Sequence, residues 1–250
     1  LPTIKKLFTE YLANGGYPAI IKNPAEKETI LSSYYETMIF KDIVERHKIK
    51  EVKKLRMLAN LLFESITKEI SYTKLANKLK SIGLNMGKQT VIEYIGYFED
   101  AYLFFQNIKY EYSLTKQLGS LKKIYCIDNG LLNAVSFKFS KDTGKLLENT
   151  VFTELKRRKK EIFYHTDKAD CDFITKQKEK IAQAIQVTET LNEENKEREL
   201  KGLLEAMNKF NLQEGTILTD NQEEEQTIQN KKIHITPLWK WLLTDEKAKQ

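Results

Sequence analysis

The stretch GKLLENTVFTELKRRKKEIFYHTDKADCDFITKQKEKIAQAIQVTETL, residues Gly144 to Leu191, decides the fold of the C-terminal part of this chain. Its first third has apolar residues at helical spacing, which predicts a helix with Glu148 near its start. Short apolar runs then predict three strands, at 161–165, 171–175 and 182–188. Asp172 lies near the start of the second strand, and the third strand ends on Gln186, Val187 and Thr188.

This order of a helix acid, a strand Asp and a strand-terminal triplet resembles the core of PD-(D/E)xK nucleases. The resemblance implies that Glu148 and Asp172 could hold a divalent metal such as Mg²⁺, and that a second acid and a Lys should follow. Here Gln186 stands at the acid position and Thr188 at the Lys position. The implied catalytic set of Glu148, Asp172 and Gln186 is therefore degenerate. Candidates to replace the missing cation are Lys156, Arg198 and Lys201.

These site residues also have structural interpretations. Glu148 could be a first-turn acid favoured by the helix dipole, Asp172 a turn cap and Gln186 a hydrogen-bonded strand residue. Single preorganised charged groups contribute about 10²–10³ to a rate, so losing two of them favours weak or absent nuclease activity. The alternative is an active Mg²⁺-dependent endonuclease that tolerates Gln186.

The rest of the C-terminal part predicts an α/β sandwich with a mixed sheet. An amphipathic helix, with apolar residues from Leu200 to Phe210, follows the third strand. It is followed by a strand at 215–219, an acidic surface loop at 223–225, a strand at 232–236 and a helix at 238–243. We expect this domain to span residues 136–244, with 245–250 as a tail.

Residues 51–135 predict three helices followed by two strands, an order typical of a winged helix-turn-helix. The predicted helices run from about Leu55 to Ile66, from 72 to 80 with Ser71 as the N-cap, and from Gly87 to Asp100. The strands are expected at 102–110 and 123–127, and Asp128 is expected to cap a short helix after them.

Such a domain would present the first residues of its third helix to the DNA major groove. The candidate DNA-binding residues there are Lys88, Gln89 and Thr90. Those on the wing are Lys116, Lys122 and Lys123, and the nuclease resemblance adds Arg157 and Arg158 beside a DNA groove. Because winged helices also serve as protein–protein modules, an interaction module or homo-oligomer interface is a second interpretation.

The first 50 residues predict two helices separated by Asn14-Gly15-Gly16-Tyr17-Pro18. The first has a stripe of Leu7, Phe8, Tyr11 and Leu12, and the second spans roughly Ala25 to Val44. The runs YLANGGYP and YYETMIFKDIVERHKI are similar to the region that follows the P-loop core in a family of predicted archaeal and bacterial AAA+-type ATPases. That family continues into a winged helix and a nuclease-like domain, which implies that residues 1–50 are a helical remnant of the ATPase lid.

The chain contains no nucleotide-binding motif of its own. In Gly83-Leu84-Asn85-Met86-Gly87-Lys88-Gln89, three residues separate the glycines, and no Ser or Thr follows Lys88. A Walker A loop needs both features to cradle phosphates. ATP would therefore bind only in an N-terminal core outside this sequence, and a start at Leu1 within a helical pattern suggests a piece of a longer protein.

Charge and composition bound the remaining possibilities. Residues 1–140 contain 21 Lys and Arg against 14 Asp and Glu, whereas residues 141–250 contain 20 against 21. The basic excess therefore lies in the first part and favours an anionic partner, with DNA first. Cys126 and Cys171 each lie in an apolar run, which predicts two buried thiols. No apolar run is long enough for a membrane span, so we expect a cytoplasmic protein.

Overall fold

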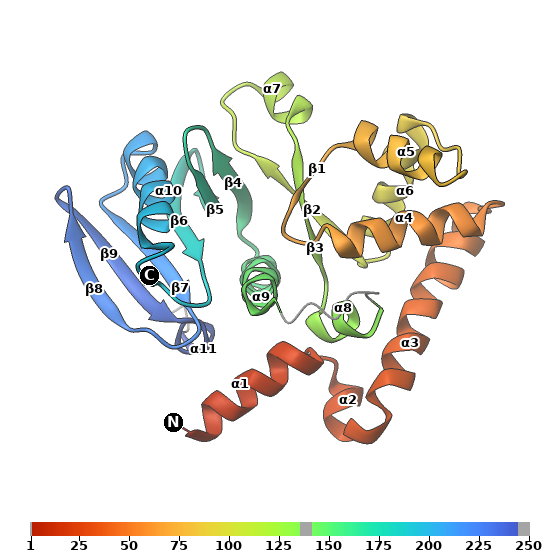
Figure 1. Ribbon diagram of the computed structural model, residues 1–250, viewed down its shortest axis with the longest axis horizontal. Helices are drawn as coiled ribbons and strands as arrows, with labels where there is room; N and C mark the ends of the chain where they lie inside the picture. The colour runs from red at the N-terminus through yellow and green to blue at the C-terminus, as the bar shows by residue number, and fades with distance from the viewer. Residues whose placement is uncertain (1, 136–141, 245–250) are drawn as a thin grey trace. The chain divides into compact units, whose positions relative to one another are not determined.

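The computed structural model describes residues 2–135 and 142–244, which form a mixed α/β structure divided into two compact units (Figure 1). The N-terminal unit comprises Thr9–Asn107 and Leu121–Lys141. The C-terminal unit comprises Leu1–Phe8, Ile108–Ser120 and Asp142–Gln250. Helix α1 (Pro2–Asn14) and strand β2 (Phe104–Lys109) each contribute residues to both units.

The N-terminal unit is mostly helical. Its elements after α1 are α2 (Pro18–Lys22), a 3₁₀ turn η1 (Pro24–Glu26), α3 (Lys27–Thr37), a π-helix η2 (Met38–Glu45), α4 (Val52–Glu64), β1 (Glu69–Ile70), α5 (Tyr72–Ser81), α6 (Lys88–Asp100), β2, β3 (Lys122–Cys126) and α8 (Asn129–Val135). Strand β1 pairs antiparallel with β3, and the strand order is β1-β3-β2. Strand β1 was not predicted, because two residues are too few to show a strand period.

The predicted helix at 25–44 is one unbroken helical run in the structure, but its helix type changes along the chain. It begins as a 3₁₀ turn, continues as α3 and ends as a π-helix. Ile39 and Ile43 both lie in the π-helix, and both are fully buried. In the apolar stripe predicted for α1, Phe8 and Leu12 are buried as expected, whereas Leu7 is 58% exposed.

Asp128 fixes the turn between α1 and α2 to the start of α8. Its carboxylate accepts hydrogen bonds from the backbone N–H of Gly16 at 2.7 Å and of Leu131 at 3.0 Å. The predicted capping role of Asp128 is confirmed. Gly15 has a φ of +78°, and a Cβ there would lie 2.0 Å from an Asp128 oxygen, so the turn requires glycine.

The C-terminal unit is a mixed sheet with helices on both faces. Its elements are α7 (Leu114–Gly119), α9 (Thr143–Arg157), β4 (Glu161–Thr166), β5 (Asp170–Gln177), β6 (Lys180–Val187), α10 (Lys196–Lys209), β7 (Glu214–Thr219), β8 (Glu224–Ile228), β9 (Lys231–Pro237) and α11 (Leu238–Leu243). The strand order is β4-β5-β6-β7-β9-β8, and the end of β2 pairs with β4. Antiparallel pairing joins β4, β5 and β6, and parallel pairing joins β6, β7 and β9.

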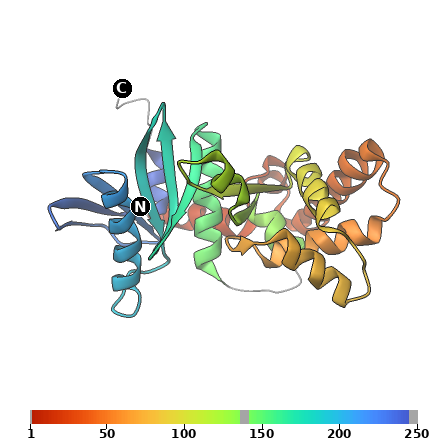
Figure 2. The ribbon, with the colours of Figure 1, turned by 90° about the horizontal axis from the view of Figure 1, so that it is seen from above.

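Helices α9 and α10 cover opposite faces of strands β5 and β6, as Figure 2 shows. Phe152 of α9 packs near Phe173 of β5, with ring centroids 6.4 Å apart. The neighbouring Ile174 lies instead in a buried cluster with Leu203 and Met207 of α10. Cys171 lies in the same cluster as Ile174. The pairing of β5 with β4 shifts register here, so that Asp172 and Phe173 together oppose one residue of β4, and the regular alternation of faces does not hold at Asp172.

One prediction for the C-terminal unit is corrected. Glu224 and Glu225, expected in an acidic loop, belong to strand β8, which pairs antiparallel with β9. Helix α7 lies between β2 and β3, where no helix was predicted. Within residues 2–135 and 142–244, none of the helices has the length and apolarity needed to cross a lipid bilayer.

Candidate functional site

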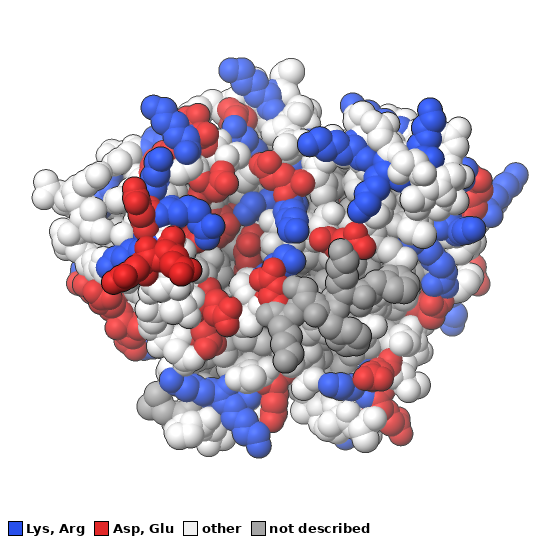
Figure 3. Space-filling view, viewed as in Figure 1, with Lys and Arg blue, Asp and Glu red and all other residues white. Residues whose placement is uncertain are grey.

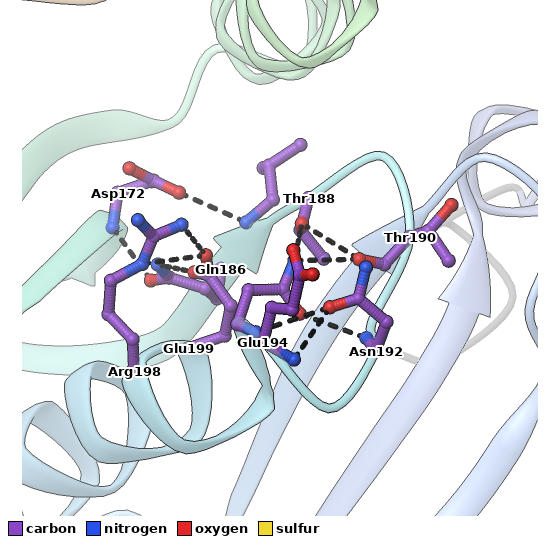
Figure 4. Close-up of polar contacts among 10 residues, drawn as sticks. Asp172, Gln186, Thr188, Thr190, Asn192, Glu194, Arg198 and Glu199 are labelled. Atoms are coloured by element: carbon purple, nitrogen blue, oxygen red, sulfur yellow. Dashed lines mark hydrogen bonds and ion pairs between the residues drawn. The ribbon is translucent and has the colours of Figure 1, made fainter.

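Asp172 and Gln186 lie side by side on neighbouring strands (Figure 4). The backbone N–H of Asp172 donates to Oε1 of Gln186 at 3.2 Å. In return, the backbone N–H of Val187 donates to Oδ2 of Asp172 at 3.0 Å. Both side chains are buried, with 8% and 6% exposure. The hairpin of β5 and β6 therefore brings together the two strand residues that the sequence singled out.

The other end of the Gln186 amide is bonded to an acid that the sequence analysis did not single out. Nε2 of Gln186 donates to Oε2 of Glu199 on α10 at 2.5 Å, and Glu199 is only 3% exposed. A signal for this acid was present in the sequence. Glu199, Leu203 and Met207 are spaced by four residues, so Glu199 lies on the buried stripe of an amphipathic helix.

Arg198 completes this network. Its guanidinium donates to Oε1 of Glu199 through Nη2 at 2.5 Å and Nε at 3.2 Å. The hydrogen bond with Glu199, its charge, and the more distant charges of Asp172 and Asp170 raise the pKa of Arg198. Arg198, one of the three candidate replacement cations, is therefore placed within electrostatic range of Asp172. Lys156 on α9 and Lys201 on α10 are exposed.

Thr188 belongs to a second set of polar contacts beside the first (Figure 4). Its hydroxyl accepts a hydrogen bond from Nδ2 of Asn195 at 3.2 Å, and the same amide donates to the carbonyl oxygen of Thr190 at 2.7 Å. Thr188 is 8% exposed. At the position where the nuclease pattern has a Lys, this chain therefore uses a buried hydroxyl to hold the turn before α10.

Glu148 lies in the second turn of α9 and is half-buried. Its neighbours Asn149 and Thr150 are almost fully buried, and the hydroxyl of Thr150 donates to the carbonyl oxygen of Leu146 at 2.8 Å. Glu148 is thus not a first-turn acid. It lies on α9, the helix that packs on the Phe173 side of β5.

The donor set around Asp172 does not fit Mg²⁺. A hard cation needs several oxygen lone pairs directed at one point. Here Gln186 directs N–H protons at Glu199, Arg198 donates to the second oxygen of Glu199, and a backbone N–H occupies one oxygen of Asp172. Across the residues that the structure describes, no three His, Cys, Asp or Glu side chains form a group that could hold a metal ion.

The surface beside this network carries both signs of charge. Figure 3 shows Asp and Glu side chains gathered over the start of α10. The exposed acids of this segment are Glu189, Glu193, Glu194 and Glu197, and its exposed cations are Lys196, Arg198 and Lys201.

The N-terminal unit places the three predicted residues of the recognition helix at the start of α6. Lys88 and Gln89 are exposed and Thr90 is half-buried, whereas Val91, Tyr94, Ile95 and Phe98 face the core as expected. Ser71 caps α5 as predicted, by accepting a hydrogen bond from the Lys74 N–H. Helix α5 packs on both α4 and α6.

The predicted wing lysines differ in their surroundings. Lys122 is only 9% exposed, with its Nζ 5.4 Å from the centroid of the Tyr72 ring. Burial, and then the charge of Lys88, lower the pKa of Lys122. Lys123 is half-buried and Lys116, on α7 of the C-terminal unit, is exposed. Lys122 is therefore not an exposed phosphate contact, but its charge adds to that of Lys88 near the start of α6.

Arg157 and Arg158 both bond to the carboxylate of Glu154, but they differ in burial. Glu154 accepts from Arg157 at 2.6 Å and from Arg158 at 2.5 Å. The Arg157 side chain is 71% exposed, whereas that of Arg158 is 7% exposed and lies over the ring of Trp241 at 4.2 Å. The Arg158 guanidinium is largely buried and also donates to the Trp241 carbonyl at 3.0 Å. Its expected place beside a DNA groove stays a prediction.

Comparison with known proteins places the chain in a family without an assigned activity. Residues 5–142 match the family described as domain of unknown function DUF8612, and the chain belongs to this family. It is 38% identical over 252 residues to the uncharacterized protein MJ1544 of Methanocaldococcus jannaschii, covering 96% of this chain and 56% of that protein. It is 28% identical over 180 residues to an uncharacterized protein of Haemophilus influenzae, covering 71% of this chain and 45% of that protein.

The chain thus spans about half the length of these curated relatives. No solved structure matches it.

Proposed function

We propose that this chain is a DNA-binding and assembly region of a longer AAA+-type ATPase. In this proposal, α4, β1, α5, α6, β2 and β3 form a winged helix-turn-helix, and the C-terminal unit is a PD-(D/E)xK-like scaffold whose catalytic set is degenerate. The relatives are longer than this chain, which leaves room for an ATP-binding core elsewhere in such proteins. ATP would be handled there.

The observation that carries the proposal is the exposed start of α6. A winged helix reads DNA with the first residues of its third helix. Lys88 and Gln89 are exposed there, and the charge of Lys88 is close enough to that of Lys122 to lower the pKa of Lys122. Two neighbouring cations that repel one another are stabilised when a phosphate lies between or beside them. The strand order β1-β3-β2 and the packing of α5 against α4 and α6 support the same assignment.

Chemically, the residues would act in different ways. Lys88 would neutralise a backbone phosphate and displace a counterion, which gives affinity without sequence preference. The amide of Gln89 can donate to and accept from an adenine edge in the major groove. Glu93, one turn later, accepts a hydrogen bond of 2.5 Å from the Tyr97 hydroxyl. That contact holds its carboxylate toward Tyr97.

Fluorescence anisotropy with a labelled duplex at several salt concentrations tests the proposal. We expect binding that weakens steeply as salt rises, because phosphate contacts release counterions. Lys88→Ala should weaken binding to all sequences, while Lys22→Ala, which also removes an exposed lysine of the same unit, should not. If the wild-type chain does not bind duplex at low salt, the proposal is wrong.

The main alternative is that the winged helix is an interaction module. Sedimentation of the isolated chain separates the two ideas. A stable homo-oligomer whose formation is abolished by Lys88→Ala, together with no DNA binding, would assign the α6 surface to protein contacts instead.

A further inference from the structure

We propose that a basic cavity at the end of α9 binds a phosphate group. The cavity has a volume of about 360 Å³ and lies wholly within the C-terminal unit. Its charged lining is Arg158, Lys159, Lys160 and Lys176, and its neutral polar lining includes Thr175 and Gln183. Among the described residues that line it there is no carboxylate.

This cavity is distinct from the Asp172 network. Thr175 and Gln183 are register partners near the closed end of the β5–β6 hairpin, whereas Asp172 and Gln186 lie toward its open end. Thr175 follows Phe173 by two residues and so shares the face covered by α9.

The dipole of α9 accounts for only part of this positive charge. Cations are favoured at a helix C-terminus, and Lys159 and Lys160 directly follow α9. Arg158 is already held by Glu154 and Trp241. Lys176, however, comes from strand β5, so the helix dipole does not explain its presence. Its nearest carboxylate, on Glu161, is 3.7 Å away and 54% exposed, which leaves that ion pair weak.

The chemistry of the lining favours phosphate over other anions. The lining includes three lysines, two after α9 and one on β5, and ammonium groups are donors that phosphate oxygens accept. Thr175, which is 1% exposed, donates its hydroxyl to Oε1 of Gln183 at 3.1 Å and so orients that amide at the cavity wall. The volume lies near the lower end of the range for small-ligand pockets, roughly 300–1,000 Å³, so the group bound would be small and polar.

The phosphate could belong to a free monoester or to a nucleic-acid strand. The inference does not rest on the proposed DNA contact of α6, because every residue of the cavity belongs to the other unit. If Lys88 variants show that α6 does not bind DNA, the cavity can still bind phosphate. If the cavity does not bind phosphate, α6 can still bind DNA.

Titration calorimetry with inorganic phosphate at low ionic strength tests the site. The test variant is Lys159→Gln combined with Lys176→Gln. The matched control is Lys196→Gln with Lys201→Gln, which removes two exposed lysines from α10 in the same unit. We expect the control to bind like the wild type and the test variant to bind roughly 10- to 100-fold more weakly, since two charge-assisted contacts are lost. Thermal melting confirms that both variants fold.

Two results would overturn the site: no phosphate binding by the wild type, or equal weakening in the test and control variants. Competition then identifies the source of the phosphate. Displacement by adenosine monophosphate but not by an unphosphorylated oligonucleotide supports a free monoester. Displacement by both compounds in the wild type, with no such displacement in the test variant, supports a strand phosphate.

Discussion

The amide of Gln186 bridges two buried acidic residues, since its Nε2 donates to the Glu199 carboxylate at 2.5 Å while its Oε1 accepts from the Asp172 backbone at 3.2 Å. An amide can serve both partners because it has a donor and an acceptor end. A carboxylate at 186 would present only acceptors to Glu199. The position is therefore matched to Glu199 in a way that a metal-binding acid would not be.

Gln186→Glu should destabilise the fold at neutral pH. The substitution places a second carboxylate against the buried Glu199 and removes the hydrogen bond between them. An uncompensated buried charge costs about 3–5 kcal/mol, so we expect a loss of that order in the free energy of unfolding. Urea denaturation measures it. The loss should shrink at acidic pH, where protonation of one carboxyl restores a donor.

Gln177→Glu is the matched control, because Gln177 is exposed at the end of β5 in the same unit. Surface changes of this kind usually stay within about 0.5 kcal/mol. Equal stability of the Gln186→Glu variant and the wild type would show that the amide bridge contributes nothing.

Arg158→Ala should cost far more stability than Arg157→Ala, although both arginines bond to Glu154. Removing Arg158 leaves Glu154, itself 8% exposed, without its buried partner and removes the stacking on Trp241. We expect a loss of about 3 kcal/mol for Arg158→Ala and under about 1 kcal/mol for Arg157→Ala. Chemical denaturation of the two variants side by side compares them, and equal losses would contradict the assignment.

The contribution of Glu154 to the free energy of unfolding should depend on pH. Burial raises the pKa of this carboxyl, but hydrogen bonds from Arg157 and Arg158 outweigh burial and hold the pKa below 4.5. A depressed pKa means that the native state binds the proton less tightly than the unfolded state. The stabilisation is therefore present at neutral pH and is lost as pH falls below 4.5 and through the native pKa. The gap between wild type and Arg158→Ala should narrow over the same range.

Supercoiled plasmid incubated with Mg²⁺ or Mn²⁺ should remain intact. The donor set at Asp172 does not suit a divalent cation, because a backbone N–H occupies one oxygen of Asp172 and Arg198 donates to Glu199. Asp172→Ala should therefore leave the gel pattern unchanged. Cleavage that requires the metal and disappears in Asp172→Ala would instead establish an active endonuclease.

Lys88→Ala should reduce the slope of log affinity against log salt by about one, because one phosphate contact is lost. Gln89→Ala should leave that slope unchanged and instead reduce discrimination between duplexes that differ at one adenine. Anisotropy titrations on a small panel of duplexes separate the two effects. If Gln89→Ala changes the salt slope, or if Lys88→Ala leaves it unchanged, the roles assigned to these two residues are wrong.

Neither cysteine should react with a thiol reagent while the chain is folded. Cys126 and Cys171 are both fully buried, and burial raises the pKa of the Cys126 thiol to about 12. At pH 8 its thiolate fraction is therefore about 10⁻⁴, and only the thiolate attacks the reagent. Colorimetric titration should find both thiols only after guanidinium is added. Fast reaction of the native chain would show that the core opens locally.

The sequence predicted the elements well where a periodic pattern was long. The spans of α4, α5, α6 and α10 agree with the predicted helices to within a few residues, because each repeats an apolar stripe over two or more turns. It failed at short or polar elements. Strand β8 reads EEQTI, in which the exposed acids hide a strand held by pairing with β9.

The candidate site was predictable in part. That Asp172 and Gln186 meet follows from the order of two consecutive strands that form a hairpin. The register shift between Thr175 and Lys176 could not be predicted from the sequence pattern. The role of Glu199 depended on the tertiary packing of α10, which local spacing does not define. The difference between Arg157 and Arg158 had the same origin, because only packing against Trp241 distinguishes two neighbouring arginines.

The closed hydrogen bonding around Gln186 also separates this domain from proteins that need an ion to fold. Empty metal sites commonly leave like charges facing one another, so that removal of the ion loosens the surrounding hairpin. Here an uncharged amide lies between the acids and a neighbouring arginine supplies the positive charge. A strong chelator should thus leave the melting temperature unchanged. The hairpin of β5 and β6 can support the rest of the sheet without a bound ion.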